Sequence, residues 1–139
     1  NPLFYQYHPP FVTRKSILSD MHALPSGKSI SDKYYLGFFQ EDMLIAILDL
    51  IKDYPKENTA WIGFFMVNIS SQAKGIGSSI IRDCISYLKE EGVIEIRLGV
   101  DRGNPQSYAF WIKNLFISYK DDPNSSVILM KRKISLSSD

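Results

Sequence analysis

The distribution of apolar residues over the first half of the chain predicts a β-hairpin followed by a third strand. Residues 34–39 and 43–49 are rich in aromatic and aliphatic side chains, and the polar residues 40–42 separate them. Two such runs around a short polar connection are typical of a hairpin. Residues 59–67 form a nearly continuous apolar run, which indicates a third, well-buried strand.

The apolar period changes after residue 75 and predicts a helix followed by a strand. One apolar helical face comprises Ile80, Ile81, Cys84, Ile85 and Leu88. Gly92 ends this helix, and residues 94–100 then alternate between apolar and polar or small side chains, as a strand does. Two strands joined through a helix pair in parallel, with a right-handed connection in about 98% of cases. We therefore expect an α/β domain whose mixed sheet contains a strand–helix–strand crossover.

The two ends of the chain add shorter elements. Residues 1–11 contain three prolines, which favour an irregular segment or an edge strand. The apolar spacing in residues 17–24 predicts a short amphipathic helix. Asn104 before Pro105 is typical of a helix start, with asparagine as the cap and proline at the first helical position. Two terminal strands are expected at residues 116–120 and 127–133.

Length and charge narrow the class of protein. With 139 residues, 45% of them hydrophobic, the chain has the composition of one globular domain, residues 1–139, rather than of a disordered segment. Its 16 Lys and Arg against 15 Asp and Glu leave a net charge of +1, too little to attract a phosphate backbone, so nucleic acid is not an expected partner. No apolar stretch approaches about 18 residues, so a membrane is not expected either.

Cysteine and histidine are scarce. Cys84 is the single cysteine and cannot form an internal disulfide, which fits a cytoplasmic location. Its place on an apolar helical face indicates a buried structural thiol rather than a nucleophile. His8 and His22 are the two histidines, and no third ligand follows them at a recognisable spacing, so no metal site is expected.

The stretch from Gln72 to Ser78 is the best candidate for a ligand site. It lies between a predicted strand and a predicted helix and contains Gly75 and Gly77. The free backbone N–H groups of a helix start attract anions, and glycines let a phosphate approach the backbone closely. The spacing excludes a P-loop and a dinucleotide fingerprint. An ordinary turn that needs glycine for a positive φ is the structural alternative.

With Gln72 three residues before Gly75 and five before Gly77, this stretch resembles the Gln/Arg-x-x-Gly-x-Gly/Ala signature of the GNAT (GCN5-related) N-acetyltransferase superfamily. Val67 before it and Asn104 after the next strand extend the resemblance, which covers about residues 34–133. The resemblance implies a mixed, mostly antiparallel sheet flanked by helices, with a central parallel crossover. The region before residue 34 is short for that family, so we expect an N-terminal part that is short or truncated.

The resemblance also implies acetyl-CoA as co-substrate, with no metal. The residues that would hold the pyrophosphate of acetyl-CoA are Gln72, Ala73, Lys74, Gly75, Ile76, Gly77 and Ser78. The strand end that would hydrogen-bond the pantetheine arm comprises Phe65, Met66 and Val67. Asn104 would contact the cofactor further along. A helix cap is another role for Asn104, and the two roles do not exclude each other.

The candidate catalytic residues depart from the family pattern. In that family the asparagine is followed at +7 by a tyrosine that often protonates the departing thiolate and at +11 by a glycine, whereas this chain has Trp111 and Leu115. An indole N–H donates a hydrogen bond but is no useful acid near neutral pH. Tyr108, one helical turn earlier, is a candidate replacement acid, with a packed aromatic as the alternative. Asp101 is a candidate base acting through water, with a merely solvated strand-end carboxylate as the alternative.

Together these features predict an N-acetyltransferase that transfers an acetyl group from acetyl-CoA to a primary amine of a small molecule or peptide. Direct transfer needs no enzyme nucleophile, and the protein contributes mainly positioning. The rival hypothesis, motivated by Trp111, is a GNAT-like domain that binds an acyl-CoA with weak turnover or none. A third is a generic anion-binding interaction domain. The sequence leaves open whether the protein forms a homodimer.

Overall fold

The computed structural model describes residues 4–7, 33–68 and 75–134. The helix predicted at residues 17–24 and residues 72–74 of the stretch from Gln72 to Ser78 lie outside these ranges. The described elements, in chain order, are β1 (Phe4–Tyr7), β2 (Lys33–Gln40), β3 (Met43–Lys52), β4 (Thr59–Val67), α2 (Ile76–Glu90), β5 (Glu95–Asp101), α3 (Pro105–Lys113), β6 (Ile117–Ser118) and β7 (Val127–Lys133).

The described strands form one mixed sheet in the order β1-β2-β3-β4-β5-β7-β6. The hairpin predicted at residues 34–49 is confirmed as β2 and β3, with Gln40 opposite Met43 at the turn. The edge strand predicted near the N-terminus is confirmed as β1, which pairs only with β2 among the described strands. β4 and β5 pair in parallel, as the strand–helix–strand pattern predicts, and the other described pairs are antiparallel.

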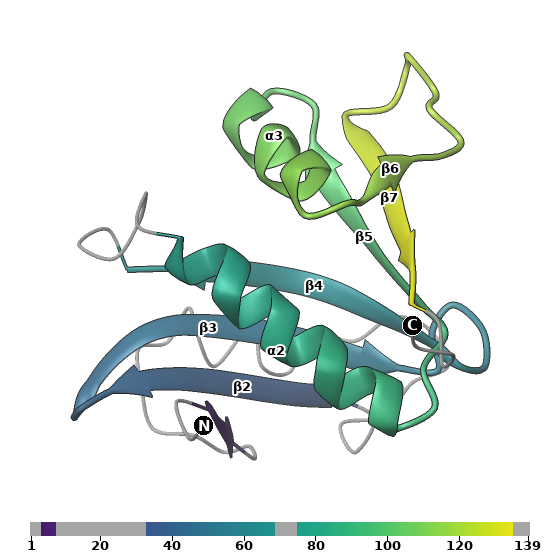
Figure 1. Ribbon diagram of the computed structural model, residues 1–139. Coiled ribbons are helices and arrows are strands. Elements are labelled where there is room, and N and C mark those ends of the chain that lie inside the picture. The colour runs from purple at the N-terminus through teal and green to yellow at the C-terminus, as the bar shows by residue number, and fades with distance from the viewer. Residues whose placement is uncertain (1–3, 8–32, 69–74, 135–139) are drawn as a thin grey trace.

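α2 covers one face of β2, β3 and β4 and closes the core on that side (Figure 1). The five apolar residues that the sequence places on one helical face, Ile80, Ile81, Cys84, Ile85 and Leu88, are all buried. They pack with strand residues of the same face, among them Leu48, Leu50 and Ile62. Each fully buried aliphatic side chain contributes about 1.5–3 kcal/mol, so this face accounts for much of the stability of the domain.

β4 and β5 separate beyond the middle of the sheet, and this divergence creates the space for a site. Their ladder runs only from Thr59 opposite Glu95 to Ile62 opposite Leu98, although both strands continue (Figure 1). The ladder between β3 and β4 also shifts register at this point, so that Gly63 is an extra residue in β4. The second half of β4 is consequently half-exposed rather than well buried, because β3 still pairs with it there but β5 does not.

The chain after α3 differs from the prediction of a strand at residues 116–120. Leu115 has a φ of 71°, which turns the chain sharply at the end of α3. Phe116 then enters the core, with its ring centroid 5.1 Å from that of Trp111. The ladder with β7 therefore begins only at Ile117 and is two residues long.

Candidate functional site

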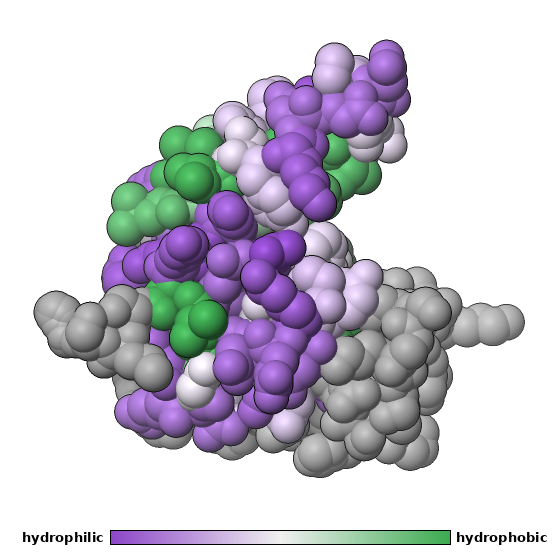
Figure 2. All heavy atoms as spheres, turned by 90° about the vertical axis from the view of Figure 1, so that its right-hand side faces the viewer, coloured by the Kyte–Doolittle hydropathy of each residue, from purple (hydrophilic) through white to green (hydrophobic). Residues whose placement is uncertain are grey.

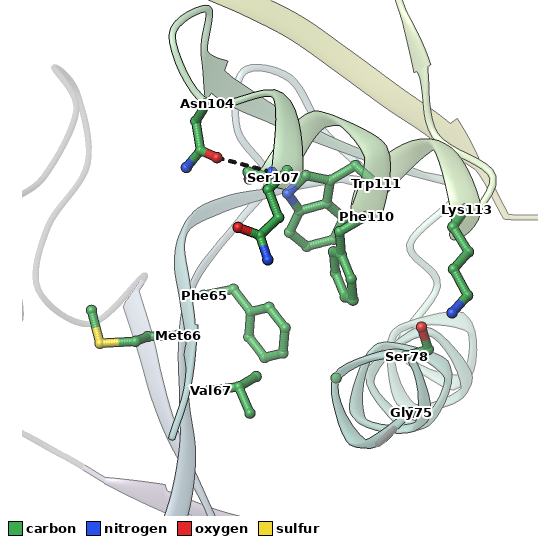
Figure 3. Close-up of a pocket in the computed structure, with 12 residues that line it drawn as sticks. Phe65, Met66, Val67, Gly75, Ser78, Asn104, Ser107, Phe110, Trp111 and Lys113 are labelled. Atoms are coloured by element: carbon green, nitrogen blue, oxygen red, sulfur yellow. Dashed lines mark hydrogen bonds between the residues drawn. The ribbon is translucent and has the colours of Figure 1, made fainter. Parts of the chain in front are cut away.

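A cavity of about 380 Å³ lies where β4 leaves β5, between the end of β4, the start of α2 and one face of α3 (Figure 3). β4 contributes Phe65, Met66 and Val67, and the start of α2 contributes Gly75, Gly77 and Ser78. The remaining wall is formed by Asn104, Gln106, Ser107, Phe110, Trp111 and Lys113 of α3 and its cap. The cavity therefore joins three segments that are distant in the sequence.

The first turn of α2 presents its backbone N–H groups to the cavity. Gly75 precedes the helix in a left-handed conformation with a φ of 77°, and no described side chain caps the helix. The first turn contains no acidic residue, so the partial positive charge of the helix start is not compensated there. These features fit a phosphate group of a ligand, which accepts hydrogen bonds from such N–H groups.

The two glycines of this turn have different roles. Gly75 has a positive φ, which is the role that an ordinary turn gives to a glycine. Gly77 has no positive φ and is needed for space, because a Cβ added there would lie 3.1 Å from Cε1 of Phe110 and 3.7 Å from Cγ2 of Val67. A side chain at Gly77 would therefore fill the cavity between α2 and α3.

Aromatic side chains form the inner wall of the cavity. Phe65 stacks on Phe110 with 5.9 Å between ring centroids, and Trp111 lies edge-on to Phe110 at 4.9 Å. Trp111 is only 6% exposed and also contacts Phe116 within the core. The position at which the family carries a tyrosine is thus occupied by a packed indole, and this wall offers an apolar surface to a ligand.

Asn114 connects α3 to the start of α2. Its side-chain Nδ2 donates to Ser78 Oγ at 3.1 Å and to the Phe110 carbonyl at 2.9 Å. Arg132 of β7 donates in turn to the Asn114 carbonyl at 3.0 Å, and burial lowers the pKa of this guanidinium. Because Ser78 Oγ accepts from Asn114, its own hydroxyl hydrogen is available to a ligand in the cavity.

Seven of the residues predicted to bind the cofactor line the cavity: Phe65, Met66, Val67, Gly75, Gly77, Ser78 and Asn104. Ile76 instead packs against the core, and Gln72, Ala73 and Lys74 lie outside the described residues. Asn104 is the cap of α3, with its Oδ1 accepting from the Ser107 N–H at 3.0 Å, so its capping role is confirmed. Its contact with a cofactor stays a prediction.

The two predicted catalytic residues do not line the cavity. Tyr108 is half-buried and packs against the core cluster. Asp101 is exposed at the end of β5, and its Oδ1 accepts from the Gly103 N–H at 2.8 Å. A role for either residue in proton transfer stays a prediction.

Sequence reasoning missed the part of the cavity that α3 provides. Gln106, Ser107, Phe110, Trp111 and Lys113 all belong to this wall. Their positions follow Asn104 at helical spacing, with Ser107 and Trp111 three and seven residues after it. Once Asn104 is placed at the site, a period of 3.6 residues therefore brings this face of α3 to the same cavity.

Three other features of the described residues bear on the chemistry. Cys84 is 1% exposed, and burial raises the pKa of its thiol to about 12, so it is not a nucleophile near neutral pH. No group of three His, Cys, Asp or Glu residues in the described ranges lies close enough to hold a metal ion, and His8 and His22 lie outside them. None of the described helices has the length and apolar character needed to span a bilayer.

Comparison with known proteins agrees with this architecture. The profile of the acetyltransferase (GNAT) family matches residues 4–115. The chain is 26% identical over 113 residues to a spermidine N(1)-acetyltransferase of Thermoplasma acidophilum, a match that spans 81% of this chain and 67% of the relative.

Solved structures share the fold. A PaiA N-acetyltransferase from Thermoplasma acidophilum, solved in complex with coenzyme A, superposes with a TM-score of 0.66 at 27% identity, over 74% of this chain and 62% of that one. The chain thus spans a little less than two thirds of that relative. An IAA acetyltransferase from Bacillus cereus superposes with a TM-score of 0.72 at 14% identity, over 94% of this chain and 98% of the other. The family profile covers most of the chain, the sheet has the same topology class, and the protein therefore belongs to the acetyltransferase (GNAT) family.

Proposed function

We propose that this protein is an acetyl-CoA-dependent N-acetyltransferase that transfers the acetyl group to a primary amine by direct attack. The observation that carries the proposal is the cavity between the diverging ends of β4 and β5, with the uncapped start of α2 at one end. Its size and its apolar wall suit the pantetheine arm of the substrate, and the N–H groups after Gly75 suit the pyrophosphate.

The unpaired edge of β4 suits the reaction itself. After Ile62 the side of β4 that faces β5 has no ladder partner among the described strands, so this edge of β4 suits hydrogen bonds to a substrate. An attacking amine converts the thioester carbonyl into a tetrahedral oxyanion, which N–H donors aimed at it stabilise. Holding the amine and the thioester together removes several kcal/mol of barrier, about 7–11 kcal/mol in well-oriented cases.

Proton transfer is the part of the proposed reaction for which the two candidate residues lie outside the cavity lining. The amine must lose a proton and the CoA thiolate must gain one. Asp101, which is exposed at the end of β5, is the candidate base acting through water. Tyr108 is the candidate acid, one turn before the buried Trp111. Because Tyr108 packs beside the cavity wall rather than in it, this role requires a water or a small side-chain movement.

A second candidate function is an acyl-CoA-binding domain with weak turnover or none. Trp111 is the observation that favours it, since this 6%-exposed indole takes the place of the usual acid and supplies no proton. Both candidates bind CoA in the same cavity, so binding alone does not separate them.

The acceptor is proposed only as a class. The relative named as a spermidine acetyltransferase acts, by its name, on an amine, which supports a primary amine as acceptor for this chain. The acceptor pocket belongs to whichever side chains border the opening between β4 and β5, so the acceptor of a relative at 26–27% identity does not by itself name the acceptor of this chain.

Release of free CoA from acetyl-CoA, measured against a panel of primary amines, tests the proposal. Amine-dependent release matched by an acetylated amine in the mass spectrum would support the transferase. Tight CoA binding with no amine-dependent release would favour the binding domain, and the variant Trp111→Tyr would then be tested for a gain of turnover. Absence of both binding and release would contradict the two candidates together.

A further inference from the structure

The ladder between β4 and β5 ends just before a pair of glycines. The last ladder pair is Ile62 with Leu98, and the next residues are Gly63 on β4 and Gly99 on β5. Both glycines are exposed. Neither glycine places a side chain in this gap, which leaves room between the two strands for a group from the far face of the sheet.

The far face of β5 is the one turned away from α2. Ile96, Leu98 and Val100 lie in the core with α2, so the alternate residues of the strand face the other way. These alternate residues are Glu95, Arg97, Gly99 and Asp101. If the cofactor occupies the α2 side, as proposed above, the acceptor must reach the thioester from this second face.

Two cations lie around one aromatic ring on this second face. Arg97 of β5 is opposite Lys131 of β7 in the ladder. The Arg97 guanidinium and Lys131 Nζ are each 5.2 Å from the centroid of the Tyr119 ring. Both charges are therefore within about one Debye length of each other at 0.1 M salt, and they repel.

The nearby acidic residue compensates only one of these charges. Glu95 forms an ion pair with Arg97, and the hydrogen bond from Arg97 to Glu95 raises the pKa of the guanidinium. Lys131 makes no ion pair with any residue in the described ranges, and Lys133 lies beside it on the same face, opposite Glu95. Arg97, Lys131 and Lys133 thus lie on this face beside one carboxylate, Glu95, and Asp101 lies further along β5.

Tyr119 and Lys131 are half-buried, and the side chain of Arg97 is 17% exposed. β6, β7 and the polar segment between them project from the rest of the molecule, and Figure 2 shows a hollow below this projecting part. Gly99 leaves room for Val127 of β7 on this face, since a Cβ at Gly99 would lie 2.8 Å from Cγ1 of Val127. Along β5, Arg97 lies two residues, or about 7 Å, from Gly99 at the opening.

We propose that Lys131 and Arg97, around Tyr119, bind a carboxylate of the acceptor whose amine reaches the cavity at Gly99. The proposal rests on the proposed transferase function and names its substrate class: amines with a carboxylate several bonds away. Asp101 lies two residues beyond Gly99 on the same face of β5, near the end of the acceptor that carries the amine. A diamine, which has a second ammonium group in place of the carboxylate, would be repelled by Lys131.

Three six-carbon amines test the charge requirement: 6-aminohexanoate, hexylamine and 1,6-diaminohexane. The amine and carboxylate of the first are about 7–8 Å apart when extended, which matches the distance along β5. We expect kcat/KM for 6-aminohexanoate to exceed that for hexylamine at least tenfold, with 1,6-diaminohexane the poorest. Equal values for the three amines would overturn the proposal.

Lys131→Met and Lys133→Met form a matched pair, since each removes one charge from the same face of β7. Lys131→Met should lower kcat/KM for 6-aminohexanoate at least fivefold and leave hexylamine and the KM of acetyl-CoA unchanged. Lys133→Met should have less than a twofold effect. Similar losses in both variants would contradict a specific site, because they would reflect only the overall charge.

Binding without turnover separates this proposal from the transferase itself. Titration of 6-aminohexanoate into the CoA-saturated protein, followed by ligand-observed NMR, should show binding that Lys131→Met abolishes. Such binding without acetyl transfer would keep the carboxylate site and refute the transferase. Acetylation of other amines with no binding of 6-aminohexanoate would keep the transferase and refute the carboxylate site.

Discussion

Replacing Gly77 by valine places a branched side chain where the start of α2 faces α3, and we expect it to abolish CoA binding in a protein that stays folded. The Cβ alone would lie 3.1 Å from Cε1 and 3.4 Å from Cζ of Phe110. The two methyl groups extend further into the space in front of the first-turn N–H groups. A pyrophosphate would then be held away from these donors.

The magnitudes favour loss of binding over loss of the fold. Valine is a slightly better helix former than glycine, by roughly 0.3–0.4 kcal/mol, and overpacking against Phe110 costs about 1–3 kcal/mol. The net destabilisation of about 0.6–2.7 kcal/mol is smaller than the 5–15 kcal/mol typical of a domain. Two lost charge-assisted hydrogen bonds weaken binding by about 3–6 kcal/mol, which is more than a hundredfold in Kd.

Isothermal titration with CoA, with circular dichroism to monitor folding, measures this effect. Ser86→Val is the matched control, because Ser86 is exposed on the same helix and distant from the cavity wall. We expect the control to bind CoA within twofold of the parent chain. A Gly77→Val variant that binds CoA within threefold of this control would refute the assignment of the cavity to the pyrophosphate.

Three further predictions follow from the same contacts. Tyr108→Phe should lower turnover without changing CoA affinity, and Trp111→Tyr should raise it; turnover that neither change affects would return Tyr108 to a packing role. Asn104→Ala should cost about 1 kcal/mol of stability through loss of the cap, and Asn104→Asp should restore it, as thermal melting would show. The Cys84 thiol should resist disulfide reagents at pH 8 until the protein unfolds. The pKa of this thiol is about 12 in the folded protein and near 9 in the unfolded chain, so its contribution to stability is fully present below pH 9. Above pH 9 the free energy of unfolding should fall by about 1 kcal/mol per pH unit relative to that of Cys84→Ala. A denaturation midpoint that changes equally in both proteins between pH 8 and pH 10 would contradict the burial of Cys84.

Regular periodicity made much of the fold predictable. The apolar face of α2 and the alternation in β5 each commit a whole element to one orientation, and the order of elements then requires a parallel β4–β5 pair. The cap at Asn104 was predictable for the same reason, because asparagine before proline satisfies the first N–H groups of a helix.

Features that depend on tertiary contacts were not predictable. Residues 59–67 have the composition of a buried strand, yet half of β4 is accessible because β5 leaves it after Ile62. Phe116 has strong strand propensity, but the turn at Leu115 and the space beside Trp111 place it in the core. The contact of Gly77 with Phe110 joins residues 33 positions apart, and no local pattern encodes it.

Thermal melting of the unmodified protein with CoA tests the central claim most directly. At 100 times its Kd, a ligand that binds only the folded state adds about 2.7 kcal/mol, which for a chain of this length raises Tm by roughly 5–15 °C. We predict such a shift with CoA and with acetyl-CoA, and little shift with pantetheine, which lacks the pyrophosphate. An unchanged Tm in millimolar CoA would contradict an acyl-CoA site in the β4–β5 cavity.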